Sequence, residues 1–462
     1  MNANTKERGD IMNEKRSSFS GNIGFILAAA GSAVGLGNLW RFPYLAAQYG
    51  GGIFLLVYLL LVLTFGFSLL ILEIAIGRKT KLSSINAYTK LNEKFGWLGI
   101  LSFLIPVLIL PYYSVIGGWV IKYMTVFLSG QGKAAADSSY FGGFISQTVS
   151  PLLMFFIFVT LTIVIVAFGV EKGVERVSKF MMPVLILITI GIAIFVATIP
   201  GAMEGIKYYL LPDFSKFSFK TICAAMGQLF YSLSIAMGIM VAYGSYVKDE
   251  IDLNKSVSQI EIFDTMVAVL SGLMIVPAVY IFSGEEGLAT GGAGLMFKTL
   301  PMVFDQMPMG SIVGGAFFIL VFLAALTSSI SLTEAIVSSF MDKFKMTRIK
   351  AVIAIYVITL LLGVPSALGY GIWGHITVLG MDFLTFFDYI SNSVMMPILA
   401  IGTCLLAGWF MNLKDIEDEI TKNGEVFKRR NVFRAMIKYI APVLLCIILV
   451  FYTLAQFGFI SY

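Results

Sequence analysis

One stretch, FILAAAGSAVGLGNLWRFPY at residues 25–44, constrains the fold of this chain more than any other. It starts as an apolar helix, but Gly31, Gly35 and Gly37 follow within seven residues. Each glycine costs a helix about 1 kcal/mol relative to alanine. Arg41 follows inside the same apolar segment. Irregular backbone at membrane depth is tolerated only where protein buries it or where it lines a water-filled cavity, so the stretch predicts a binding site in a broken membrane-spanning helix.

The composition supports a membrane setting. Of the 462 residues, 58% are hydrophobic and 13% are charged, and the mean hydropathy is +0.88. This balance excludes a soluble domain of this size and predicts an all-α polytopic membrane protein whose main partner is the lipid bilayer. The net charge of +5 does not indicate nucleic acid as a partner, because the charges gather in particular loops. Residues 1–20 are polar and precede a full-length span, so no cleavable signal peptide is expected.

The reactive side chains are few and dispersed. Cys223, Cys404 and Cys446 are isolated within apolar segments, and their number is odd, so no disulfide framework is implied. The single histidine, His375, cannot form a zinc site alone. We therefore expect no organic cofactor and no catalytic residues, and an enzyme is disfavoured because HExxH and GxSxG motifs are absent from the sequence.

Apolar runs of about 20 residues predict the membrane spans. Eleven such segments are expected, at 22–47, 52–76, 98–128, 150–170, 179–199, 221–246, 257–284, 311–341, 349–364, 384–411 and 434–458.

Lysine and arginine predict the orientation of these spans. They are frequent before span 1 and after spans 2, 4, 6, 8 and 10, whereas the opposite loops hold few, such as Lys133 and Lys298. Loops rich in lysine and arginine face the cytoplasm. The N-terminus is therefore expected to be cytoplasmic and the C-terminus external.

A second interrupted helix is expected in span 6, where residues 227–246 read GQLFYSLSIAMGIMVAYGSY. Small or hydroxyl residues alternate there, and this break lies five spans after the first. Interrupted spans at matching positions of two inverted halves indicate the midplane site of a secondary transporter. The predicted organisation is a cytoplasmic segment at 1–20, inverted repeats at 21–199 and 220–411, and a further helix at 430–459.

Such breaks offer the right chemistry for a zwitterion and a cation. Freed carbonyl groups suit Na⁺, and the free N-terminus of a half-helix attracts a carboxylate. Simpler interpretations remain open, because Gly31 and Gly35 could serve helix packing and serines in spans often bond to their own helix. GLGNLW is not a dinucleotide fingerprint, since no strand precedes it.

Polar residues within other spans favour a site. Thr327, Ser328, Ser329 and Ser331 lie close together in span 8. Ionisable groups in spans cost about 2.5–3.5 kcal/mol on insertion scales and are functional candidates. Here they are Arg41, Glu73, Asp264, Glu334 and Asp388.

At these residues the chain closely resembles the neurotransmitter:sodium symporter family, and in particular its bacterial amino-acid transporters for leucine, tyrosine, tryptophan and multiple hydrophobic amino acids. The resemblance covers nearly the whole chain. The motifs that carry it are AGSAVGLGNLWRFPY (30–44), GGIFLLVYLL (51–60), GQLFYSLS (227–234) and ALTSSIS (325–331).

The resemblance implies a five-plus-five inverted repeat with helices 1 and 6 unwound midway, in a bacterial inner membrane, as a monomer or weak homodimer. It implies two sodium ions, one held by the Ala33 carbonyl, Asn38, Ser232 and Asp264, the other by Gly31, Val34, Ala324, Thr327 and Ser328. The implied substrate site comprises Ala33, Gly35, Leu36, Gly37, Ile109, Tyr113, Tyr231, Ser232, Ser234, Met237, Ser328, Ser329 and Leu332. The implied gates are Arg41 with Asp388 outside and Arg16 with Asp342 inside, and Glu73 would brace the break in span 6.

Departures from the family pattern indicate which substrates and ions this chain would transport. Monoamine carriers have an aspartate at the position of Gly35, so a substrate with its own carboxylate is favoured. Chloride-dependent relatives have a serine at the position where this chain has Ala268. Their other chloride ligands match Tyr58, Gln228 and Ser232. Asp264, one turn before Ala268, is expected to supply the negative charge instead, and its protonation on the return step would allow proton counter-transport.

Two further features concern the pocket and the inner end of span 5. Met237 is flexible and polarizable, which favours a tolerant pocket for hydrophobic or aromatic side chains. Gly173 and Pro183 either end and kink the helix or, as in the family, let the inner end of span 5 unwind and release sodium.

The predicted function is sodium-coupled import of a hydrophobic or aromatic L-amino acid by alternating access, independent of chloride. A transporter of the same fold with another coupling ion or another small zwitterion is the alternative. A sensor or channel would need a pore-lining repeat or a soluble domain, and no predicted loop is long enough for such a domain.

Overall fold

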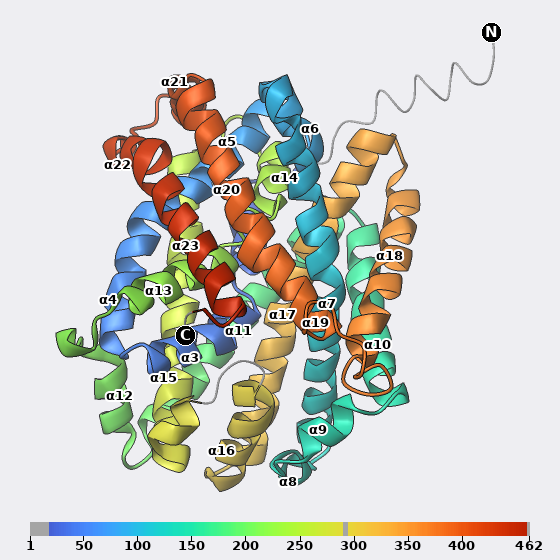
Figure 1. The fold of residues 1–462 in the computed structure, drawn as a ribbon, viewed down its shortest axis with the longest axis vertical. Coiled ribbons are helices and arrows are strands. Elements are labelled where there is room, and N and C mark those ends of the chain that lie inside the picture. Colours follow the sequence, from blue (N-terminus) through green and yellow to red (C-terminus); the bar gives the residue numbers. More distant parts are fainter. Residues whose placement is uncertain (1–17, 290–293, 460–462) are drawn as a thin grey trace.

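The computed structural model describes residues 18–289 and 294–459 (Figure 1). Arg16 and most of the predicted 1–20 segment lie outside these residues. The described residues are predominantly helical, and their only β-type pairs are two isolated bridges, Gly51 with Pro212 and Val378 with Met381. This confirms the predicted all-α class.

The first half of the chain holds long helices joined by short ones, and several helices contain π-helical segments (η). In order they are α2 (Asn22–Ala33), η1 (Gly37–Arg41), α3 (Phe42–Gln48), α4 (Gly52–Leu61), η2 (Val62–Gly66), α5 (Phe67–Thr80), α6 (Ser84–Leu91), η3 (Glu93–Phe95, 3₁₀), α7 (Gly96–Leu128), α8 (Gly132–Ala135), α9 (Tyr140–Ile145), α10 (Val149–Ala167), η4 (Val170–Glu175) and α11 (Arg176–Ala197).

The second half continues in the same manner. Its elements are α12 (Ala202–Leu210), η5 (Phe214–Lys216, 3₁₀), α13 (Phe219–Ser232), α14 (Ile239–Tyr246), α15 (Leu253–Ala289), η6 (Leu295–Thr299), α16 (Leu300–Gln306), α17 (Gly310–Phe344), α18 (Arg348–Leu368), α19 (Phe383–Asp388), η7 (Tyr389–Met395), α20 (Met396–Leu405), η8 (Leu406–Phe410), α21 (Leu413–Ile420), α22 (Arg430–Ala435), η9 (Met436–Ile440) and α23 (Ala441–Gln456).

The described residues form nine helices that are long and apolar enough to span a membrane. A tenth span is the pair Asn22–Ala33 and Gly37–Gln48, which is bent by 53° at its break. The predicted span at 221–246 is divided into α13 and α14, neither of which is long enough to cross a bilayer alone. The chain is thus a multi-pass membrane protein, while the count of eleven spans and the inverted repeat remain predictions.

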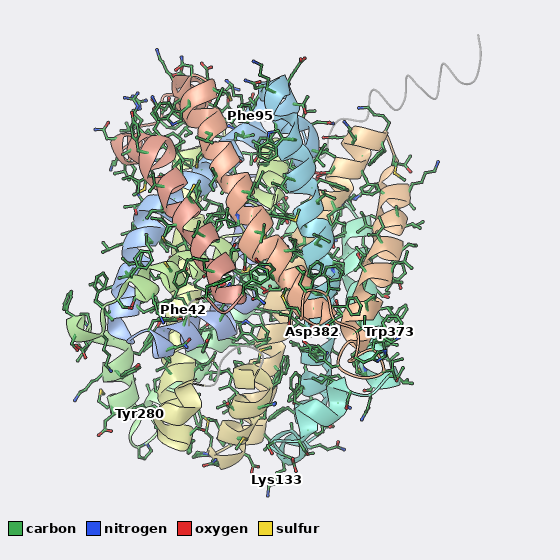
Figure 2. All side chains as sticks on the ribbon, in the orientation of Figure 1. Phe42, Phe95, Lys133, Tyr280, Trp373 and Asp382 are labelled. Atoms are coloured by element: carbon green, nitrogen blue, oxygen red, sulfur yellow. The ribbon has the colours of Figure 1, made fainter. Side chains whose placement is uncertain are left out.

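The predicted cytoplasmic and external loops can be located in the fold. Figure 1 shows α21 and α22 at the same end as the termini of α5 and α6, and α8, α9, α12 and α16 at the other end. Figure 2 shows Phe95, in a predicted cytoplasmic loop, near the first end and Lys133, in a predicted external loop, at the second. The two predicted sets of loops therefore lie at opposite ends of the helices.

Glycines bring α5 and α14 into backbone contact. A Cβ atom on Gly77 would overlap the carbonyl oxygen of Val241, and one on Gly244 would overlap the carbonyl oxygen of Ile74. Only glycine allows helices to approach this closely, as is common between membrane helices. This contact holds α14, the second half of the broken span 6, against span 2.

We expect Gly77→Val to destabilise the protein by about 3 kcal/mol, because the backbone carbonyl of Val241 cannot move aside as a side chain could. Thermal unfolding in detergent would measure the effect. Gly191→Val is the matched control, since Gly191 also lies in a long helix but a Cβ atom there would have nothing within 4 Å. Equal unfolding temperatures for the two variants would contradict the expectation.

Candidate functional site

The first break lies where the sequence predicts it. Helix α2 ends at Ala33, and Val34 adopts an extended conformation with ψ of 93°. Helical structure resumes at Gly37. The interruption leaves carbonyl groups of the last α2 turn and amide groups near Leu36 and Gly37 outside regular helix bonding.

The second break follows Ser232 and ends at Gly238, the residue before α14. Ser234, Ala236 and Gly238 all have positive φ, at 52°, 58° and 72°. Such a conformation costs a non-glycine residue about 1–3 kcal/mol and needs support from its surroundings. Glu73 supplies it, because its buried carboxylate accepts a hydrogen bond of 2.8 Å from the Ala236 amide. The predicted bracing contact is thereby confirmed.

The two breaks meet through serine hydroxyl groups. The carbonyl oxygen of Ser32 accepts hydrogen bonds from Ser234 Oγ at 2.9 Å and from Ser328 Oγ at 3.1 Å. The hydroxyl of Ser32 also donates to Ser234 Oγ at 3.2 Å. Residues from α2, the span 6 break and α17 are therefore joined at one point.

A cavity with about 340 Å³ of empty space lies between these breaks. Its lining comprises Ser32, Ala33, Gly35, Leu36, Gly37, Ile109, Tyr113, Tyr231, Ser234, Met237, Ile239, Ser328 and Leu332. All but two of the predicted substrate residues are in this lining. The exceptions are Ser232, which bonds to Asp264, and Ser329, which bonds to Thr162 Oγ1 at 3.1 Å.

One polar group that lines the cavity, the hydroxyl of Tyr113, lacks a hydrogen-bond partner in the described part of the chain. The hydroxyl of Tyr113 is buried, lines the cavity and has no hydrogen-bond partner among the described residues. A Cβ atom on Gly35 would lie 3.3 Å from this hydroxyl and 2.7 Å from Ser328 Oγ. Because an unpaired buried hydroxyl is costly, the arrangement suits a polar ligand group at this place.

A buried carboxylate cluster adjoins the cavity. Asp264 Oδ1 accepts hydrogen bonds of 2.7 Å from Asn38 Nδ2 and from Ser232 Oγ, and Asp264 Oδ2 accepts one of 3.3 Å from the Tyr58 hydroxyl. Each of these residues is at most 1% exposed. Gln228, one helical turn before Ser232 in α13, donates to the Gly37 carbonyl in the first break at 2.9 Å. The cluster therefore gathers oxygen atoms and one carboxylate, which are ligands suited to a hard cation.

The residues predicted to bind the second sodium ion also lie close together. Thr327 Oγ1 donates to the carbonyl oxygens of Leu323 and Ala324 at 3.0 and 3.1 Å. A Cβ atom on Gly31 would lie 3.4 Å from Cβ of Thr327, so the end of α2 packs directly on α17 there. Val34 follows in the break, and Ser328 is the next residue of α17.

The structure describes three of the four predicted gate residues. The Arg41 guanidinium lies 5.4 Å from the ring centre of Tyr231, and Asp388 Oδ1 accepts hydrogen bonds from Tyr112 and Asn392 at 3.0 and 2.6 Å. On the other side Asp342 Oδ2 accepts a hydrogen bond of 2.6 Å from the Ser83 amide. Its predicted partner Arg16 lies outside the described residues.

An ionic bridge ties the loop after α14 to neighbouring elements. Asp249 pairs with Lys81 and Lys422, each at 2.8 Å. Hydrogen bonds from Lys422 and Lys81 lower the pKa of Asp249 to about 2. Its carboxylate is therefore ionised at neutral pH, and the bridge links the loop after α14 to the end of α5 and to the loop after α21.

Two lining residues were not predicted. The segment around Gly173 is the π-helical η4, which is continuous with α11 in this structure, and its unwinding during transport stays a prediction. Ser32 and Ile239 line the cavity although neither was assigned to it. Ser32 could have been found from its place among the glycines of the first break, whereas Ile239 carries no signal in an apolar span.

Comparisons with known proteins agree with this arrangement. The sodium:neurotransmitter symporter family profile matches residues 16–133 and 145–462. The chain is 34% identical over 456 residues to the uncharacterized sodium-dependent transporter YhdH of Bacillus subtilis, covering 96% of this chain and 98% of that protein. It is 26% identical to the human sodium- and chloride-dependent GABA transporter 2, covering 91% and 78%.

A solved structure gives the same result for the fold. The crystal structure of MhsT in complex with L-phenylalanine matches with a TM-score of 0.85 and 37% sequence identity, covering 94% of this chain and 99% of that one. The predicted resemblance is confirmed by the profile, by the relatives and by this fold. The chain belongs to the sodium:neurotransmitter symporter family, a family of membrane transporters.

Proposed function

We propose that this protein is a sodium-coupled symporter that imports a hydrophobic or aromatic L-amino acid by alternating access and does not require chloride. The observation that carries the proposal is the cavity between the two helix breaks, beside the buried Asp264 cluster. Its lining combines apolar side chains with a few polar groups, as small-molecule sites do.

The proposed orientation of the bound substrate follows from the free amide and carbonyl groups at the two helix breaks. The carboxylate of the amino acid would meet the amides near Leu36 and Gly37 and the unpartnered hydroxyl of Tyr113. Its amino group would meet carbonyl oxygens of Ala33, Tyr231 and Ser234. The side chain would then extend toward the apolar lining, which is consistent with the L-phenylalanine bound to MhsT.

Two sodium ions are proposed as co-transported substrates. The first would be held by the Ala33 carbonyl, Asn38, Ser232 and Asp264 together with the substrate carboxylate. The second would be held by carbonyls of Gly31, Val34 and Ala324 with the hydroxyls of Thr327 and Ser328. Sodium-dependent relatives such as YhdH support sodium as the coupling ion.

Chloride independence is proposed from the Asp264 cluster. Tyr58 and Ser232, two residues that match chloride ligands in relatives, already donate hydrogen bonds to Asp264. A fixed carboxylate in their midst supplies the negative charge that an anion would otherwise bring. Ala268, one turn further along α15, is buried and offers no hydroxyl.

The proposed orientation has a cytoplasmic N-terminus and an external C-terminus in a bacterial inner membrane, and the proposed state is a monomer or weak homodimer. Arg41 and Asp388 would close the external side, and Asp342 would take part in closing the internal one. The bridge from Asp249 to α5 and α21 would have to open or move with α14 when the site faces inward.

The hydroxyl of Tyr113 gives a direct test of the pose. We expect Tyr113→Phe to weaken binding of L-phenylalanine by about 10–150-fold, which corresponds to losing a hydrogen bond to a charged group of about 1.5–3 kcal/mol. Radioligand binding in sodium buffer would measure it. Tyr123→Phe is the matched control, because Tyr123 lies on the same helix α7 but donates to the Phe297 carbonyl outside the cavity. Similar losses in both variants would contradict the pose.

The main experiment is a scintillation-proximity screen of all twenty amino acids in sodium and in choline buffers. Binding of apolar and aromatic amino acids in sodium alone would support the proposal. Sodium-independent binding, with uptake into vesicles driven by a proton gradient, would instead establish the alternative coupling ion. Selective binding of a polar zwitterion would overturn the assigned substrate class while leaving the transporter fold intact.

A further inference from the structure

A second cavity lies far along the fold from the substrate site, where the helices of spans 10 and 11 end beside α21. This open-sided hollow, called here the interfacial pocket, has a volume of about 660 Å³. Its chemistry is set by six of its lining residues: Trp409, Lys414, Glu417, Arg434, Lys438 and Tyr439. Figure 1 shows α21, α22 and the start of α23 together at this end of the molecule.

The interfacial pocket carries unbalanced positive charge. Arg434 is held by Glu417 through two hydrogen bonds of 2.6 and 2.7 Å, so that pair is neutral. The side chains of Lys414 and Lys438 have no acceptor among the described residues, although both line the pocket. Two lysines therefore line the hollow without a carboxylate bonded to them, because Glu417, the acidic residue of the lining, is paired with Arg434 and Arg430.

Aromatic rings form the wall on the membrane side. Trp409 and Tyr439 are 59% and 58% exposed, and their rings meet edge to face at 5.7 Å. The indole Nε1 of Trp409 donates to the Lys438 carbonyl at 2.9 Å, which fixes the ring beside the basic residues. Exposed tryptophan and tyrosine at the ends of spans mark the level of the lipid headgroups.

An exposed apolar stripe runs from the pocket along the last span. Ile440, Val443, Ile447, Val450 and Leu454 are all exposed and recur at intervals of three and four residues. Side chains at this spacing lie on one face of a helix. The stripe begins next to Tyr439, so a molecule in the pocket can place a polar head against the lysines and an apolar chain along α23.

We infer that the interfacial pocket binds the headgroup of an anionic phospholipid, with its phosphate between Lys414 and Lys438 and one acyl chain along the stripe. Basic pockets at membrane helix ends recognise anionic lipid headgroups, and each lysine near the surface contributes about 1 kcal/mol. A free phosphate ion would use the lysines but not the stripe. A second copy of the chain would need an acidic surface to match the two lysines.

The test is native mass spectrometry of the full-length protein in detergent, titrated with phosphatidylglycerol or phosphatidylcholine. Phosphatidylglycerol is expected to bind more tightly than phosphatidylcholine. The double variant Lys414→Gln/Lys438→Gln should bind phosphatidylglycerol about 25-fold more weakly, at about fivefold for each charge removed. The charge-keeping variant Lys414→Arg/Lys438→Arg should bind like the unaltered protein.

The matched control removes two exposed lysines elsewhere at the same end of the molecule, in Lys343→Gln/Lys350→Gln. This variant should retain phosphatidylglycerol binding. Equal binding by both glutamine variants would overturn the inference, as would equal affinity for the two lipids or displacement of phosphatidylglycerol by millimolar inorganic phosphate. A dimer that survives delipidation and is lost in the Lys414→Gln/Lys438→Gln variant would assign the pocket to a second copy and overturn it as well. None of these outcomes depends on sodium or on the transported substrate.

Discussion

Replacing Asp264 with asparagine is expected to weaken Na⁺ binding by about 150–5,000-fold and to remove sodium-driven uptake. The reason is that the proposed first sodium ion is paired with this carboxylate, which is fully buried and bonded to Asn38 and Ser232. Removing one partner of a buried charge pair costs about 3–5 kcal/mol. Asparagine keeps the size of the side chain, so the effect reports the charge.

Sodium titrations of L-phenylalanine binding would measure this loss. Glu261→Gln is the control, because Glu261 is a buried carboxylate on the same helix that pairs with Arg429 at 2.9 Å. It should leave the sodium dependence of binding unchanged. Equal sodium affinity of Asp264→Asn and the unaltered protein would exclude Asp264 as a sodium ligand.

The same residue tests chloride independence. Replacing chloride by gluconate should leave uptake by the unaltered protein unchanged. In the double variant Asp264→Asn/Ala268→Ser, the carboxylate beside Tyr58 and Ser232 is lost and the new hydroxyl adds a hydrogen-bond donor for a chloride ion that would bring the missing charge. Uptake by this variant is expected to return only in the presence of chloride. A chloride requirement in the unaltered protein would contradict the proposed role of Asp264.

Replacing Gly35 with aspartate is expected to reduce amino-acid uptake by at least about 100-fold. The new Cβ atom would lie 2.7 Å from Ser328 Oγ and 3.3 Å from the Tyr113 hydroxyl, inside the cavity. The added carboxylate would also stand near the position proposed for the substrate carboxylate, and two close buried carboxylates cannot both stay ionised. The size of the aspartate side chain and its negative charge are therefore both expected to reduce uptake.

Two further variants separate size from charge. Gly35→Ala is expected to cause a smaller loss from crowding alone, and Gly35→Asn matches the volume of aspartate without its charge. Competition binding with phenethylamine, which lacks a carboxylate, should improve relative to L-phenylalanine only in Gly35→Asp. Equal loss in the aspartate and asparagine variants, with no change in preference for the amine, would contradict the placement of the substrate carboxylate at Gly35.

The sequence was most informative about the helix breaks, because both depend on local chemistry. Glycines within 31–37 prevent a regular helix, and Gly238 adopts its positive φ angle without steric cost, whereas Ser234 and Ala236 do so at a cost. The structure has α2 ending at Ala33 and α13 at Ser232, as the pattern predicts. Glu73 was identified because an ionisable group in a span needs a partner, and its partner is the Ala236 amide.

The sequence was less informative where a side chain's direction depends on packing. Ser328 and Ser329 are neighbours in a hydroxyl-rich motif, but successive helical residues point about 100° apart. Ser328 therefore faces the first break, while Ser329 faces Thr162 of α10 and does not line the cavity. Composition cannot distinguish the two, because both faces of this buried helix meet protein.

By itself, the sequence determined the all-helical membrane class and the positions of the two breaks, since the bilayer requires apolar spans and internal backbone hydrogen bonding. The tertiary structure alone decided which distant groups meet. Asp264 reaches Asn38 across 226 positions of the chain, and Arg78 reaches Glu419 across 341. Such contacts depend on how helices pack against one another, and neither hydropathy nor local backbone preference contains that information.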